Sequence, residues 1–408
     1  MYVVVICGQL MFEGLIILIP SSYKYILSIV TISLPQLSVP PELLCPVIHM
    51  ATLYAIGSNG SGQLGIGHKE DVSVPKQVLF DGDGPTGIKQ IRAGGNHTLI
   101  LSTMGTLYCS GESLHGACGP GSEEYYTTFK AAKIAQEPSA EQPHTILCAA
   151  TWQASIIVQK DENGQATKIF SFGTGNKGEL GLGEFIFRTS KPQLIPNFPP
   201  SGLEIVDLAA SVSHVVAVLS NGDVYGWGSG RKGQLGEPEG IFHSPRKIEN
   251  LGFKVNRAVC GQEFAYLLGE SGTSQHKILG SDKRNIKSSM PDTLPAWKDV
   301  GAGWGSIGLL KSEGQLISWG RDDHGQLAPT NLSPLSQIAI GSEHSVALTS
   351  EGDVCAWGWG EHGNCGPGTT NGDVKGRWNV IASSKYLPPD TKISYIGAGC
   401  ATSWIFLS

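Results

Sequence analysis

The 408-residue sequence contains few charged residues and no strong excess of either sign. Asp, Glu, Lys and Arg make up 16 % of the chain, and 29 basic against 35 acidic side chains leave a formal charge of −6. Hydrophobic residues make up 40 %, which excludes a disordered chain, because such chains combine high charge with low hydrophobicity. Without clustered Lys and Arg, broad electrostatic binding to DNA or RNA is not favoured, and we expect no direct nucleic-acid partner.

The nine cysteines lack the spacing of a metal site. No two of them form a Cys-x-x-Cys pair and their number is odd, so the sequence suggests neither a structural zinc site nor a disulfide framework. We therefore expect reduced thiols and a protein of the cytoplasm and nucleus. The sequence predicts no metal site and no cofactor on this chain.

Residues 1–49 differ in composition from the rest of the chain. Their only charges are Glu13, Lys24 and Glu42. Their apolar stretches are broken by Gly8, Pro20, Pro35 and Pro40. The segment lacks the positive start and small-residue cleavage site of a signal peptide. Glu13 interrupts its best candidate for a membrane helix. We expect translation to begin at Met50 and residues 1–49 to pack poorly and have no role; a membrane anchor is the alternative.

Glycine is abundant, at 54 of 408 residues or about 13 %, roughly twice the usual share. From Met50 onward many of these glycines belong to a repeated segment, which we call the head. It consists of a short β-prone run, a glycine, a polar tip and then Gly-Gln-Leu-Gly or a variant. The heads begin at Leu53, Leu107, Ile169, Val224, Lys277, Leu316 and Val354, the fifth being decayed.

Each head is followed by a second segment, the tail, that is typical of two further strands. The clearest copies are 91–101 and 338–348, and weaker copies lie at 146–158, 205–219, 255–268, 300–310 and 393–407. Dipeptides such as Asn163-Gly164 and Asn221-Gly222 separate tail from next head, and they supply the positive-φ residue that a hairpin turn needs.

Seven such units over about 359 residues average about 51 residues each, within the range of four-stranded propeller blades. One blade cannot bury both of its faces, whereas seven arranged radially can, and closure of the ring removes the exposed sheet edges. The sequence therefore predicts an all-β protein, with residues 50–408 forming one seven-bladed β-propeller.

Two positions of the repeat carry recurrent large side chains. One head position holds aromatic residues, which we expect to fill the gaps between blades: Phe172, Trp227, Trp319 and Trp357. One tail position holds histidines, whose recurrence indicates a repeated structural hydrogen bond and not a metal ligand or catalytic base: His97, His214 and His344.

The alternation of Tyr-x-Trp-Gly-x-Asn-x-x-Gly-Gln-Leu-Gly with Ala-x-Gly-x-x-His-Ser-x-x-Leu resembles the regulator-of-chromosome-condensation repeat family, whose members are seven-bladed propellers. The resemblance covers residues 52–407. Within that family, the segments 357–366, 399–405 and 54–60 are similar to those of the alpha-tubulin-suppressor, or killer-toxin-insensitivity, subfamily.

The subfamily resemblance implies a non-catalytic protein that forms a heterodimer with a small metal-binding protein of zinc-finger type. The pair would support diphthamide formation on translation elongation factor two and Elongator-dependent modification of wobble uridine in tRNA. It would be linked to Elongator indirectly, and the resemblance implies neither a membrane partner nor a cofactor.

Enzyme motifs are few. Gly-x-Gly-x-x-Gly occurs at 173–178, 228–233 and 358–363, but no helical run follows any copy. Dinucleotide binding needs such a helix, because its N-terminus contacts the pyrophosphate. No nucleophile elbow, zinc-protease pair or phosphate-binding loop with lysine is present. The sequence does not indicate catalysis.

A binding protein is expected to depart from its repeat where it contacts a partner. Trp152 and Trp304 occupy a loop position where other tails have smaller or polar residues, so they are predicted to project from one face; the alternative is that they fold inward and cap the channel. Trp359 replaces the smaller residues that follow the head glycine elsewhere. We expect Trp359, Glu361 and His362 to contribute to the partner surface.

Two other function classes remain open on sequence. The first is guanine-nucleotide exchange on a small GTPase, the activity of the family's founding member, for which the inserts 119–143 and 365–391 could supply a surface element. The second is scaffolding in chromatin or the ubiquitin pathway, against which the acidic balance and the absence of a ubiquitin-ligase domain argue.

Overall fold

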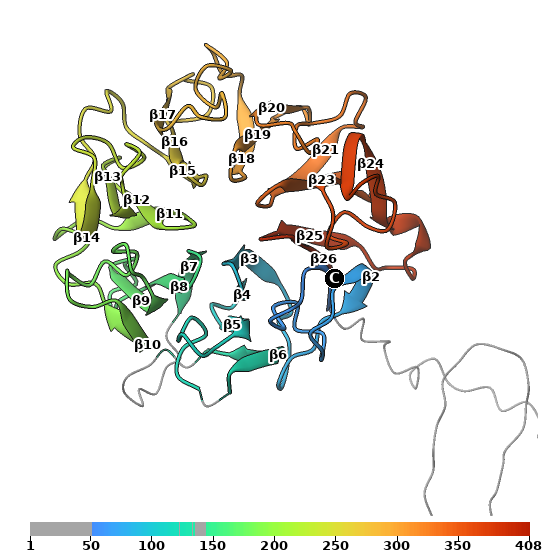
Figure 1. Ribbon diagram of the computed structural model, residues 1–408, viewed down its shortest axis with the longest axis horizontal. Coiled ribbons are helices and arrows are strands. Elements are labelled where there is room, and N and C mark those ends of the chain that lie inside the picture. The colour runs from blue at the N-terminus through green and yellow to red at the C-terminus, as the bar shows by residue number, and fades with distance from the viewer. Residues whose placement is uncertain (1–50, 122, 133, 135–143) are drawn as a thin grey trace, which may run out of the picture. The chain divides into compact units, whose positions relative to one another are not determined.

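The computed structural model describes residues 51–121, 123–132, 134 and 144–408, so the expectations for residues 1–49 lie outside it. Within this range seven antiparallel sheets are arranged around a common axis (Figure 1). The architecture is the seven-bladed β-propeller that the repeat predicted. The described residues contain a single short 3₁₀ helix, η2 (Ser384–Tyr386), and no helix long and apolar enough to cross a membrane.

We number the blades in chain order from the first tail. Blade 1 comprises β3 (Ile88–Ala93), β4 (His97–Ser102), β5 (Leu107–Glu112) and β6 (Tyr125–Ala131). Blade 2 comprises β7 (Thr145–Ala150), β8 (Ala154–Gln159), β9 (Lys168–Thr174) and β10 (Arg188–Leu194). Blade 3 comprises β11 (Ile205–Ser211), β12 (His214–Leu219), β13 (Val224–Ser229) and β14 (Ile241–Lys247).

Blades 4 and 5 have three strands each, and their heads are the less regular ones. Blade 4 comprises β15 (Arg257–Cys260), β16 (Phe264–Leu268) and β17 (His276–Gly280), and blade 5 comprises β18 (Trp297–Ala302), β19 (Ser306–Lys311) and β20 (Leu316–Gly320). Blade 6 comprises β21 (Leu335–Ile340), β22 (His344–Thr349), β23 (Asp353–Trp359) and β24 (Asp373–Ser383).

Blade 7 closes the ring with strands from both ends of the propeller. Its inner strands are β25 (Ile393–Ala398) and β26 (Thr402–Leu407), and its outer strands are β1 (Thr52–Gly57) and β2 (Val72–Gln77). The blade is therefore offset from the sequence repeat by half a unit, because each tail pairs with the head that follows it. The first head pairs with the last tail, and six residue pairs join β1 to β26.

One glycine in each repeat lies directly against the loop that joins the first two strands of its blade, and we call it the crossing glycine. These seven residues have φ between +94° and +117°, and a Cβ atom on any of them would lie 2.2–2.6 Å from a carbonyl oxygen of that loop. The backbone N–H of the next residue donates to the same oxygen at 2.7–2.9 Å. Only glycine combines this φ with this approach. The seven are Gly57, Gly111, Gly173, Gly228, Gly280, Gly320 and Gly358.

The four recurrent aromatic side chains of the heads are buried in the contacts between blades, as predicted: Phe172, Trp227, Trp319 and Trp357. Two of the indoles also donate hydrogen bonds to the preceding blade. Trp227 Nε1 lies 2.9 Å from the carbonyl oxygen of Glu179, and Trp357 Nε1 lies 3.2 Å from that of Gln326. Each of these indoles thus combines apolar burial with a satisfied polar atom.

The recurrent histidines begin the second strands of blades 1, 3 and 6. His97 Nε2 lies 3.1 Å from Ser155 Oγ, and His344 Nε2 lies 3.0 Å from Ser403 Oγ, so a buried imidazole–hydroxyl bond joins neighbouring blades at both places. At His214 the neighbouring blade supplies Ala265 at the equivalent position, which has no hydroxyl. The predicted repeated hydrogen bond is therefore present at two of the three histidines.

The expectation of reduced thiols is wrong at one place. Cys109 of β5 and Cys118 of the following loop form a disulfide, with their Cα atoms 5.4 Å apart. The two residues share the head of blade 1, where the loop after β5 returns to its own strand. The sequence spacing alone does not reveal this return. Among the described residues, Cys148, Cys260, Cys355, Cys365 and Cys400 are free.

The three buried histidines predict a stability that falls with acid. Burial lowers the pKa of His97, His214 and His344 from 6.5 to about 4, so each ring is neutral in the folded protein while the unfolded chain binds a proton below pH 6.5. Their contribution is complete above pH 6.5 and is lost as the pH falls from 6.5 to about 4, by roughly 3 kcal/mol for each ring. Urea unfolding at pH 7 and pH 5 measures the loss.

The matched variant is His344→Gln, because glutamine can still bond to Ser403 but does not titrate. Its free energy of unfolding should fall less steeply between pH 6.5 and 4 than that of the unmodified chain, by about 1.4 kcal/mol per pH unit. An unchanged slope would contradict the assignment.

Candidate functional site

Antiparallel strands place two sets of loops on one side of the propeller. These are the loops between the first and second strands of each blade and those between the third and fourth, and we call this side the loop face. The residue after each crossing glycine lies on this face, and its backbone N–H donates a hydrogen bond to a carbonyl oxygen of the inner loop. The seven residues at this position are Ser58, Glu112, Thr174, Ser229, Ser281, Arg321 and Trp359.

Trp359 is the one aromatic residue among these seven, and it is half-buried. Its indole lies against two imidazoles, with ring centroids 5.3 Å from His362 and 6.4 Å from His324. Each imidazole faces a carboxylate: His362 Nδ1 lies 2.7 Å from Asp71 Oδ2, and His324 Nδ1 lies 3.0 Å from Asp373 Oδ1. We call these five residues the Trp359 cluster. It spans blades 5, 6 and 7.

Glu361, predicted with Trp359 and His362, lies in the loop after β23 and is exposed. The structure thus brings these three predicted residues together on the loop face. Sequence reasoning missed the other members of the cluster. His324 and Asp71 lie in the heads of the two neighbouring blades, so no short-range pattern links them to Trp359.

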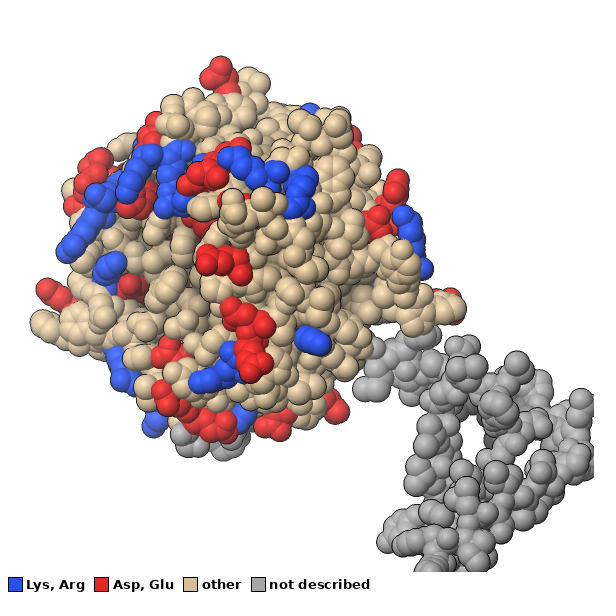
Figure 2. Space-filling model, turned by 45° about the vertical axis from the view of Figure 1, so that its right-hand side comes forward, with Lys and Arg blue, Asp and Glu red and all other residues tan. Residues whose placement is uncertain are grey.

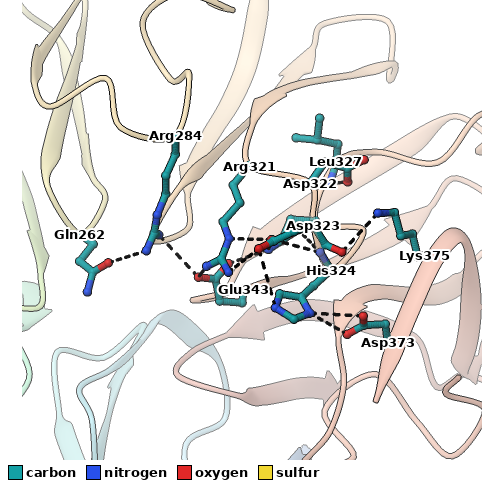
Figure 3. Close-up of polar contacts among 11 residues, drawn as sticks. Gln262, Arg284, Arg321, Asp322, Asp323, His324, Leu327, Glu343, Asp373 and Lys375 are labelled. Carbon is teal, nitrogen blue, oxygen red and sulfur yellow. Dashed lines mark hydrogen bonds and ion pairs between the residues drawn. The ribbon is translucent and has the colours of Figure 1, made fainter. Parts of the chain in front are cut away.

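A buried carboxylate supports the cluster from the side of the propeller axis. Glu343 forms ion pairs with Arg321 and, at 3.6 Å, with Arg284, and Gln326 Nε2 donates to its second oxygen at 2.8 Å (Figure 3). Its backbone oxygen accepts from the N–H of Trp359 at 2.9 Å. The contacts of Glu343 therefore extend over blades 4, 5 and 6.

The network continues outward through Asp323, which accepts from Arg321 at 2.6 Å (Figure 3). Burial alone would raise the pKa of Asp323, but hydrogen bonds from Arg321 and Gln326 hold it well below its usual range. Asp323 is therefore ionised at neutral pH. With Asp71, Asp373 and Glu361, the surroundings of Trp359 carry several carboxylates, and Figure 2 shows acidic and basic side chains intermixed on the surface.

Trp152 and Trp304 point inward over the channel, which is the alternative that the sequence left open. They come from the loops after β7 and β18, and their ring centroids are 6.2 Å apart. Both line the central cavity, so they meet over its mouth on the loop face, although Trp152 keeps 40 % of its surface exposed. Both rings pack toward the axis, which is the inward alternative, and the part of Trp152 and Trp304 in partner binding stays a prediction.

Backbone hydrogen bonds hold these loops to one another around the rim. The N–H of Gly95 donates to the carbonyl of Trp152 at 2.9 Å, and the N–H of Trp152 donates to that of Val212 at 3.0 Å. On the other side, Trp304 accepts from Gln262 at 3.0 Å and donates to Ser342 at 2.7 Å. The loop residues that the sequence alignment treats as equivalent are thus in direct contact between successive blades.

The cavity along the axis has a volume of about 580 Å³ and is lined by the seven innermost strands. In four of these strands, one shared position carries a polar side chain that accepts a hydrogen bond from a backbone N–H of the next blade. Such bonds run to Gln90 from Cys148 at 2.9 Å, to Asp207 from Ala258 at 2.8 Å, to Gln337 from Ile396 at 3.3 Å and to Tyr395 from Ile91 at 3.1 Å. Sequence reasoning missed this belt, although its members share one position of the repeat.

Exposed apolar side chains gather elsewhere on the loop face. Phe185, Ile186 and Phe187 lie in the loop between β9 and β10, and Phe185 is 88 % exposed. Leu114 of the neighbouring blade is also exposed, and its carbonyl accepts a hydrogen bond from Arg188. Sequence reasoning missed this patch as well, because its residues belong to head loops of irregular length.

The three Gly-x-Gly-x-x-Gly segments lie in loops between antiparallel strands, as predicted. They connect β9 to β10, β13 to β14 and β23 to β24, so none precedes a helix. The insert 365–391 contains β24 and η2, and the insert 119–143 includes β6. Among the described residues, no group of three metal-ligating side chains comes together.

The geometry defines a class of protein. It is a closed seven-bladed propeller in which residues that depart from the repeat lie on one face. Residues 52–405 match the RCC1-like domain family, and the chain belongs to that family. An RCC1 repeat-containing protein of Schizosaccharomyces pombe is 32 % identical over 318 residues, which cover 72 % of this chain and 83 % of that protein.

The secretion-regulating guanine nucleotide exchange factor of Bos taurus is 30 % identical over 302 residues, or 69 % of this chain. The match spans 62 % of that relative's length. Among solved structures, Prp20p of Saccharomyces cerevisiae has a TM-score of 0.74 at 22 % identity, covering 88 % of this chain and 92 % of its own. At that identity the likeness shows the fold alone.

The position of Trp152 predicts an effect at Gly95. A Cβ atom at Gly95 would lie 2.4 Å from Cε2 of the Trp152 indole, so Gly95→Ala should displace that ring from the mouth of the cavity. We expect stronger quenching of tryptophan fluorescence by acrylamide and a loss of stability of about 1–3 kcal/mol.

The matched control is Gly60→Ala, where a Cβ atom meets nothing within 4 Å and the backbone is not in the positive-φ region. It should leave both readouts unchanged. Equal behaviour of the two variants would contradict the packing described for Trp152.

Proposed function

We propose that this chain is a non-catalytic binding protein that forms a heterodimer with a small metalloprotein of zinc-finger type. Through that partner it would support diphthamide formation on elongation factor two and Elongator-dependent modification of wobble uridine in tRNA. The proposal joins the subfamily resemblance of residues 357–366 with the place of those residues on the loop face. It also includes action in the cytoplasm and nucleus, with an indirect link to Elongator.

The single observation that carries the proposal is the indole of Trp359 at a position where five of seven repeats have Ser, Thr or Glu. A crossing glycine fixes its backbone, and two imidazoles fix its ring. A rigid, half-exposed indole is a favourable anchor for a protein partner, because it contributes a large contact area without a large loss of side-chain freedom.

The charges around this indole indicate the chemistry of the contact. Glu361 is exposed, and Asp71 and Asp373 already hold the two imidazoles. A Lys or Arg side chain of the partner placed over the indole would gain a cation–π contact and nearby carboxylates. We therefore propose that the partner presents a basic side chain beside an apolar contact, with its metal away from this chain.

Trp359→Ala should weaken the complex strongly. Loss of a central aromatic anchor costs about 2 kcal/mol or more, so the Kd should rise about 30-fold. The partner is first obtained by affinity purification from cells with identification by mass spectrometry, and the affinity is then measured by titration of the two purified proteins.

The control is Tyr386→Ala, an exposed aromatic residue in η2, which follows the outer strand of the same blade at its opposite end. It should bind as the unmodified chain does. Full affinity of the Trp359→Ala variant would refute the proposed surface, and recovery of no small Cys-rich metalloprotein would refute the proposed partner.

Guanine-nucleotide exchange is the second candidate, favoured by the 30 % identity to the exchange factor of Bos taurus. It predicts faster release of a fluorescent GDP analogue from one member of a panel of small GTPases. The heterodimer proposal predicts no acceleration for any member, so one assay separates the two candidates.

A further inference from the structure

One position of the channel-lining strands departs from its repeat more strongly than any other. Two residues after the polar belt, six innermost strands have nothing larger than valine, which keeps the cavity open. These residues are Ala149, Ala209, Val259, Gly301, Ala339 and Gly397. The seventh strand, β3, has Arg92 at this position, and Arg92 lines the cavity.

Arg92 is not neutralised by a neighbour. Its one hydrogen bond within the described part of the chain is from Nη1 to the carbonyl oxygen of Ile91, at 3.0 Å. The other arginine of the cavity, Arg257, is held differently, because it lies 2.9 Å from Asp207 and 3.8 Å from Asp299. The cavity thus holds a guanidinium with free N–H groups beside a second one that is already paired.

The side chain of Arg92 reaches toward the axis. Arg92 of blade 1 and Asp299 of blade 5 line the same cavity. Burial raises the pKa of Asp299, and the charges of Arg257 and, to a smaller extent, Arg92 act in the opposite direction. Tyr395, beside Arg92 in the neighbouring blade, accepts from the N–H of Ile91, so its hydroxyl hydrogen is free to donate. Two donors therefore converge on the cavity from adjacent blades.

The remaining walls combine small and apolar residues with a few polar ones, among them Gln90, Gln337 and the Arg257–Asp299 pair, and the indoles of Trp152 and Trp304 cover one mouth. A volume of about 580 Å³ lies within the range of small-molecule sites, which combine apolar walls with a few directed polar groups. A guanidinium in such a site binds carboxylates and phosphates in preference to neutral or cationic molecules, because it can donate two parallel hydrogen bonds.

We propose that the central channel is a binding site for a small organic anion, whose carboxylate or phosphate group is held by Arg92 and Tyr395 beneath the Trp152–Trp304 pair. This site is separate from the Trp359 cluster and does not depend on the proposed heterodimer.

The test is isothermal titration calorimetry of the full chain at low ionic strength, with benzoate and phenyl phosphate as separate probes. We expect at least one to bind, and comparison of the two assigns the anionic group. Arg92→Ala introduces the residue that three other blades have at this position, so the variant should fold normally. It should raise the Kd at least about tenfold, as expected for loss of a charge-assisted pair.

The matched control is Lys76→Ala, which removes one positive charge from an exposed position of β2, outside the residues that line the cavity. It should leave the Kd within about threefold of the original. The proposal would be overturned by the absence of binding of both probes up to about 10 mM, by unchanged binding to the Arg92→Ala variant, or by an equal loss in both variants.

Discussion

The propeller depends on one contact that occurs in every blade: a glycine of the third strand passes directly over a carbonyl oxygen of the inner loop. The approach leaves no room for a Cβ atom, and it aligns the next backbone N–H with the same oxygen. Seven such contacts fix the ends of the third strands to the inner loops, and hydrogen bonds between those loops connect several successive blades. The high glycine content and the geometry of the ring therefore both follow from this close approach of glycine to a carbonyl oxygen.

This contact also separates the residues that build the scaffold from those that can vary. The residue after each glycine has a fixed backbone but a side chain that the core does not need, so it can change without loss of the fold. Ser, Thr and Glu occupy most of these positions, whereas blades 5 and 6 have Arg321 and Trp359. The buried Glu343 joins these two positions, because it pairs with the guanidinium of one and accepts from the N–H of the other.

The fold was predictable from sequence because its causes are local and repeated. Strand runs recur in all seven units, turn dipeptides separate several of them, and the aromatic position is filled in four, where Trp227 and Trp357 are buried as the repeat predicted. The directions of Trp152 and Trp304 were not predictable, since the packing space at the axis depends on all seven blades. The Trp359 cluster was found in part: Trp359 and His362 are three residues apart in sequence, whereas Asp71 reaches them only because the first head closes the ring.

The most direct test of this account is hydrogen–deuterium exchange of the full chain with and without its purified partner. Protection is expected in the loop-face segments of blades 5 to 7, around residues 321–327, 359–364 and 68–71. Protection confined to the turns at the opposite ends of the strands, such as 103–106 or 384–392, would contradict it.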